Sequence, residues 1–119
     1  MSTAETRFSI KRDVPSIEQV LIQALVAAGW KSSLMSRNKI TTQPLSKTVI
    51  SGSDSFVGNF SAVVTWEDCQ DRIDVLVVVS ERASSTPALA AKCADYCNAI
   101  VAVIPYNCLL GQGRNSHDG

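Results

Sequence analysis

The run RIDVLVVVSER, residues 72–82, constrains the fold of this chain more than any other stretch. In a strand its apolar side chains alternate between two faces. One set is Ile73, Val75, Val77 and Val79, and the other is Leu76 and Val78. A strand that is apolar on both faces needs a covering layer on each. The sequence therefore predicts a largely buried strand and leaves open what covers its smaller set.

The preceding segment completes a hairpin. Residues 56–67, FVGNFSAVVTWE, are rich in β-branched and aromatic side chains, which is typical of a long strand. The DCQD between the two strands has the composition of a turn, so we expect an antiparallel pair. Trp66 shares its strand parity with Phe60, Ala62 and Val64. Periodicity alone does not decide which parity faces the core.

A first amphipathic helix is predicted between Ser16 and Gly29. Ser16 and Gln19 form a capping-box pattern, and Gly29 stands where a left-handed residue ends a helix. Trp30 would then fold back on the last turn. The apolar stripe of this helix consists of Ile17, Val20, Leu21, Ala24, Leu25 and Ala28.

A second amphipathic helix begins at Thr86 and Pro87, an N-cap followed by a proline at the first helical position, and it ends before Pro105. Its stripe consists of Leu89, Cys93, Tyr96, Cys97, Ile100, Val101 and Ile104. Two one-sided helices must both bury their stripes, and we expect them to do so on the same face of one sheet.

The other strands are shorter. Residues 6–12 alternate like a half-buried strand, and residues 31–43 read as two short strands around a turn at Arg37 and Asn38. Residues 44–55 are rich in Ser, Gly and Thr, and are either a long loop or a poor edge strand.

These elements predict an α+β fold, a β-α-β-β-β-β-α two-layer sandwich with a mostly antiparallel sheet and two helices on one face. We expect residues 1–106 to form a single domain and residues 107–119 to be a flexible C-terminal tail.

The 119 residues carry no net charge, although residues 1–47 hold seven Lys and Arg against three Asp and Glu. A nucleic-acid module is usually basic overall and, for single strands, exposes aromatic side chains, so nucleic acid is not expected as a partner. The chain shows no apolar leader and no run long enough to span a membrane. We therefore expect a cytoplasmic protein that does not bind membranes.

Residues that could carry out chemistry are few. Four cysteines lack a C-x-x-C spacing, and Cys93 and Cys97 lie in an apolar stripe, so we expect buried thiols and no metal site. Cys69 lies among acidic residues that disfavour its thiolate. The one histidine is His117, close to the chain end, and the carboxylates Asp74 and Glu81 are interpreted as part of a solvated hairpin. No catalytic residue and no cofactor is predicted, and we expect a protein that is not an enzyme.

The leading hypothesis is a protein-interaction or self-associating module, such as a homodimer, that uses the outer face of the sheet. Its interaction surface would include Leu76, Val78 and Trp66, because a two-layer fold offers no third layer to cover an apolar outer face.

An alternative is a carrier of a small apolar ligand, with residues 44–58 as a mobile lid over a pocket between sheet and second helix. The lid would contribute Val49, Ile50 and Phe56. In a further alternative, residues 44–55 fold over Leu76 and Val78 and cover them within the same chain.

Overall fold

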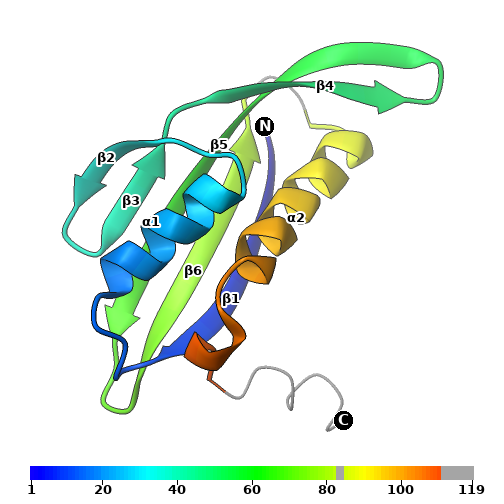
Figure 1. Cartoon of the computed structure of the whole chain (residues 1–119). Helices are drawn as coiled ribbons and strands as arrows, with labels where there is room; N and C mark the ends of the chain where they lie inside the picture. The colour runs from blue at the N-terminus through cyan, green and yellow to red at the C-terminus, as the bar shows by residue number, and fades with distance from the viewer. Residues whose placement is uncertain (83–84, 111–119) are drawn as a thin grey trace, which may run out of the picture.

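The computed structural model describes residues 1–82 and 85–110 of the chain. In chain order its elements are β1 (Ser2–Lys11), α1 (Ile17–Ala27), β2 (Ser32–Ser36), β3 (Lys39–Thr42), β4 (Leu45–Ser51), β5 (Asp54–Asp68), β6 (Arg72–Glu81), α2 (Pro87–Ala102) and the 3-10 turn η1 (Tyr106–Cys108). The strands form one antiparallel sheet, and Figure 1 shows both helices on the same face of it. The expected α+β two-layer sandwich is confirmed.

The long strand β5 organises the sheet. It pairs with β6 on one side along residues 60–68. On its other side it pairs with β3 along residues 63–65 and with β4 along residues 54–60. The order is β1-β6-β5-β3-β2, with β4 beside the other half of β5. In Figure 1 the β4–β5 hairpin extends as an arm beyond the start of α2.

Helix α1 has the predicted ends. The Ser16 hydroxyl accepts a hydrogen bond from the backbone N–H of Gln19 at 3.3 Å. At the other end Gly29 has φ +97, and the N–H of Trp30 donates to the carbonyl of Leu25 at 2.9 Å. This is the six-to-one bond of a Schellman motif, and it places the Trp30 side chain in the core.

Helix α2 also begins as predicted. The Thr86 hydroxyl accepts from the N–H of Leu89 at 3.2 Å, and Pro87 occupies the first turn. The side chains that it buries are Leu89, Cys93, Cys97 and Ile100. Neither described helix, at 11 and 16 residues, is long and apolar enough to cross a membrane.

The register of the β5–β6 hairpin decides which strand parity faces the helices. Val64 lies opposite Val77, and Trp66 lies opposite Val75, and all four are buried. Even residues of β5 and odd residues of β6 therefore form the floor beneath the helices. Above this floor, the Tyr96 ring of α2 meets Phe60 edge-on, with ring centroids 5.0 Å apart.

Residues 44–55, for which a loop or a poor edge strand was expected, form mainly the strand β4 and the start of β5. Leu45 lies opposite Phe60 and Ile50 opposite Ser55, so the segment lies in the plane of the sheet. It does not fold over Leu76 and Val78, and that alternative was wrong. The Ser, Gly and Thr content of the segment does not indicate a strand, because the pairing depends on the partner strand β5.

The C-terminal segment follows the edge of β1 as far as it is described. Leu109 forms an antiparallel bridge with Ile10, and the N–H of Leu110 donates to the carbonyl of Ser9 at 3.0 Å. The remainder of the tail predicted for 107–119, residues 111–119, lies outside the described residues.

Candidate protein-interaction surface

The face of the sheet opposite the helices, here called the outer face, can be read from the strand registers. Two adjacent rows of side chains cross its centre. The Leu76 row consists of Arg7, Leu76, Thr65, Lys39 and Ser36. The Val78 row consists of Glu5, Val78, Val63, Thr41 and Leu34.

These two rows bring together four apolar side chains from three strands, here called the apolar stripe: Leu34, Val63, Leu76 and Val78. Leu34 is 63% exposed on β2, and the other three are half-buried by their sheet neighbours. In the described part of the chain both helices pack on the opposite face, so neither covers the stripe (Figure 1). A polar rim around an apolar centre is the composition of a protein-interaction surface.

Two polar rows flank the stripe along the strands. The Asp74 row consists of Ser9, Asp74 and Glu67, and the Ser80 row consists of Thr3, Ser80 and Ser61. The Asp74 row thus makes its end of the outer face acidic, whereas the Ser80 row carries only hydroxyl groups.

The outer face is hollowed at its acidic end. A shallow groove of about 850 Å³ lies between the Asp74 row and the Leu76 row, and its lining includes Arg7, Leu76 and Leu110. Leu110 pairs beside Ser9 and so closes the groove at the β1 edge. Because arginine and carboxylate groups both line the groove, it does not favour a ligand of a single charge sign.

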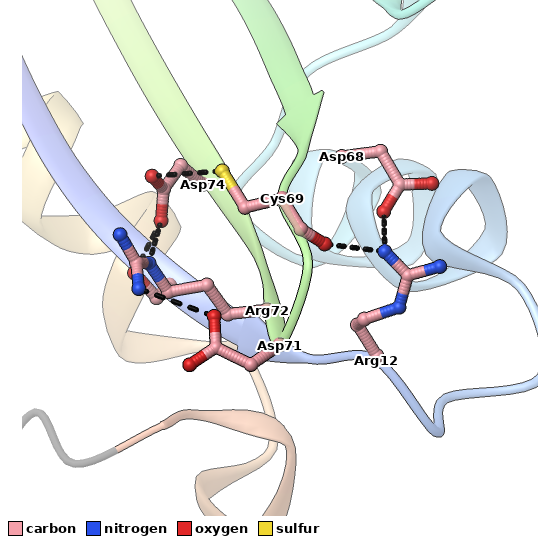
Figure 2. Close-up of polar contacts among 7 residues, drawn as sticks. Arg12, Asp68, Cys69, Asp71, Arg72 and Asp74 are labelled. Carbon is pink, nitrogen blue, oxygen red and sulfur yellow. Dashed lines mark hydrogen bonds and ion pairs between the residues drawn. The ribbon is translucent and has the colours of Figure 1, made fainter.

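Polar contacts fix the acidic end of this groove (Figure 2). One carboxylate oxygen of Asp74 accepts from the Ser9 hydroxyl at 2.8 Å and from Arg72 Nε at 2.9 Å. The other accepts from the Cys69 thiol at 3.3 Å. Beside these contacts, Arg12 of the β1–α1 loop pairs with Asp68 and donates to the carbonyl of Cys69. These bonds tie the β1–α1 loop to the β5–β6 turn.

These contacts shift the ionisation of the groups involved. The hydrogen bond from Ser9, followed by those from Arg72 and Cys69, lowers the pKa of Asp74. The bond to Asp74 raises the pKa of the Cys69 thiol, and burial and the Asp74 charge add to the effect. Cys69 is thus held as a neutral thiol, which is a poor nucleophile, in the direction expected from its acidic surroundings.

The residues predicted for the interaction surface are not all on the outer face. Leu76 and Val78 lie there, side by side in the two central rows. Trp66 is 8% exposed and lies on the helix-facing side of β5, which is the face of the sheet opposite to that of Leu76 and Val78. Its parity places it in the core floor, and a strand turns successive side chains to opposite faces.

The three residues assigned to a lid lie on the β4–β5 arm in different environments. Val49 is buried in the core, Phe56 is half-buried against it, and Ile50 is 74% exposed. The space between sheet and second helix, where the carrier hypothesis places its pocket, contains the rings of Phe60 and Tyr96 in contact. The carrier hypothesis stays an untested prediction.

The helical cysteines are buried and point at β1. The Cys97 thiol donates to the carbonyl of Ala4 at 3.4 Å, and the Cys93 thiol donates to that of Ser2 at 3.7 Å. Burial is the first cause that raises the pKa of each thiol. Among the residues described, no cluster of three or more Cys, His, Asp or Glu side chains is arranged to hold a metal ion.

Sequence reasoning missed three features of this region. Leu34 belongs to the stripe only through the β2–β3 register, and Leu110 reaches the groove only through its bond to Ser9; neither relationship can be read from local periodicity. Glu81, interpreted as solvated, is fully buried, and its carboxylate accepts from the N–H of Asn59 at 3.0 Å. Its parity with Val79 was the available signal.

Neither a protein-family model nor a curated protein matches this chain. The outer face is therefore the feature of the molecule that indicates a function.

Proposed function

We propose that this protein is a non-catalytic interaction module that binds another protein chain, a copy of itself or a different partner, through the outer face of its sheet. The observation that carries the proposal is the apolar stripe, which crosses a sheet face that neither described helix covers. When one face of an antiparallel sheet is exposed to water, the side chains on that face are ordinarily polar.

The size of the stripe is consistent with a modest interface. Burying about 300 Å² of apolar surface contributes about 7 kcal/mol at ~25 cal/mol per Å², before the costs of association are subtracted. Arg7 and Glu5, both exposed at the edge of the face, supply the charged rim that gives orientation more than affinity.

The test places a charge in the stripe. When a partner covers the stripe, Leu76→Lys buries an ammonium group at the interface, so we expect association to weaken at least tenfold. Sedimentation and recovery of bound partner from the native cell measure the change. Leu34→Lys repeats the test at a position 63% exposed, where the fold does not depend on the side chain.

Val26→Lys is the matched control, because it adds the same charge at an apolar side chain that is 60% exposed on α1, on the opposite side of the sheet. It should leave association unchanged, and circular dichroism should show all three variants folded. If both stripe variants associate like the parent protein, the outer face is not the interaction surface.

A further inference from the structure

Resting on this proposed function, we infer that the partner is a second copy of the chain, packed outer face to outer face about a two-fold axis. The axis lies in the interface, crosses the strands, and passes between the Leu76 row and the Val78 row. The result is a four-layer assembly with the two sheets inside and the helices outside.

This axis makes the two central rows complementary to each other. Rotation about it places the Leu76 row of one copy over the Val78 row of the other. Leu76 then meets the partner's Val78, and Thr65 meets the partner's Val63. Leu76 and Val78 thus bury each other, as an isologous interface requires, while Val63 packs on the partner's Thr65 and Leu34 on the partner's Ser36.

The charges at the β1 edge match in the same arrangement. Arg7 of each copy lies over Glu5 of the partner subunit, so the two exposed ion pairs present within the chains become a ring of four alternating charges. A two-fold axis parallel to the strands, running between β6 and β5, instead places β1 over β3, with Arg7 against the partner's Lys39. Like charges in contact disfavour that second arrangement.

The flanking rows also pair favourably. The carboxylates of Asp74 and Glu67 face the hydroxyls of the partner's Ser80 and Ser61, which can donate to them. At the two ends of the face the arrangement opposes like charges, where Arg72 approaches the partner's Arg82 and Lys11 approaches the amino terminus of the partner's Met1. Arg72 is already paired with Asp74 and Asp71, and sheets packed at about 30° diverge toward their ends.

The area of the face sets the strength of the dimer. The two central rows cross five strands and the two flanking rows cross three, so together they cover roughly 500 Å² in each copy, from a strand spacing of about 4.8 Å and a same-face spacing of about 6.8 Å. A standard interface buries about 800 Å² per partner. We therefore expect a weak dimer that dissociates on dilution in the micromolar range.

The test exchanges the two charges at the β1 edge. Arg7→Glu places Glu against the partner's Glu5, and Glu5→Arg places Arg against the partner's Arg7, so each single variant should dimerise at least tenfold more weakly. An equimolar mixture of the two should form a heterodimer, and the double variant should dimerise like the parent protein. Sedimentation from about 1 µM to about 1 mM measures all four.

Both substitutions are at exposed positions, and equal urea midpoints check that the fold is intact. A protein that stays monomeric throughout this range overturns the self-pairing. So does a dimer whose strength does not respond to the charge exchange, or a double variant that fails to recover. If the monomeric protein instead retains a different partner that Leu76→Lys releases, self-pairing is wrong and the proposed function stands.

Discussion

The backbone N–H of Ala62 donates to the side-chain hydroxyl of Thr42 at 2.9 Å, in the interior of the sheet. This bond lies where β5 changes partners, because its pairing with β3 ends at Val63 and its pairing with β4 begins at Phe60. A side chain thus replaces the missing backbone acceptor, and Thr42 is buried for that reason.

We expect Thr42→Val to lower the free energy of unfolding by about 1–3 kcal/mol, because the isosteric change leaves the N–H of Ala62 buried without an acceptor. Urea denaturation monitored by circular dichroism measures the loss. Thr42→Ser keeps the acceptor and should cost less, whereas Thr41→Val, on the half-buried outer face, should cost little. Equal stability of Thr42→Val and the parent protein would show that the N–H finds another acceptor.

A second stability prediction concerns Gly58 at the base of the β4–β5 arm. A Cβ there would stand 2.8 Å from the Phe60 ring and 3.4 Å from Leu89. The ring is fully buried and held edge-on by Tyr96, so it cannot move freely. We expect Gly58→Ala to cost about 1–3 kcal/mol of unfolding free energy, the usual range for overpacking.

The double variant Gly58→Ala with Phe60→Leu identifies the cause of that loss. Replacing the Phe60 ring creates a cavity but also relieves the clash with the new Cβ. The double variant should therefore lose less unfolding free energy than the sum of the losses of the two single variants. Additive losses would place the strain in the backbone of the arm and not in the ring contact.

The helices and the β5–β6 hairpin could be predicted because their signals are local. Ser16 and Gly29 mark the ends of α1 by side-chain capping and by a positive φ, and both operate within a few residues. The alternation of residues 72–82 likewise gave two faces without knowledge of any partner strand.

The rest depended on contacts between residues distant in sequence. The Ser- and Thr-rich residues 45–51 become a strand because β5 extends far enough to pair with them. Trp66 could be assigned to the helix-facing side only once its pairing with Val75 was known, and Leu34 joined the stripe only through Thr41. Register across strands, and not propensity, determines the candidate surface.

The reactivity of Cys69 provides a third prediction. Its pKa lies above the ordinary 9.0, first because the thiol donates to Asp74. Asp74→Asn removes the carboxylate charge, so the thiolate fraction at pH 8 should rise and alkylation by iodoacetamide should accelerate, by up to about tenfold for each pKa unit removed. Mass spectrometry of the peptide that contains Cys69 follows the rate, with Cys108 as an internal reference. Unchanged rates would mean that access, and not ionisation, limits the reaction.

The same carboxylate predicts a dependence of stability on pH. Because the pKa of Asp74 is lower in the folded protein than its usual 3.8, protonation favours the unfolded chain. The stabilisation is complete above the unfolded-state pKa and is lost as the pH falls through the lower folded-state value.

Ser9→Ala removes the first cause of the shift without changing the charge, and Asp74→Asn removes the titration itself. Urea midpoints measured between about pH 6 and pH 3 should therefore fall most in the parent protein, less in Ser9→Ala and least in Asp74→Asn. If all three fall in parallel, other carboxylates account for the acid sensitivity, and the contacts of Asp74 do not contribute to it.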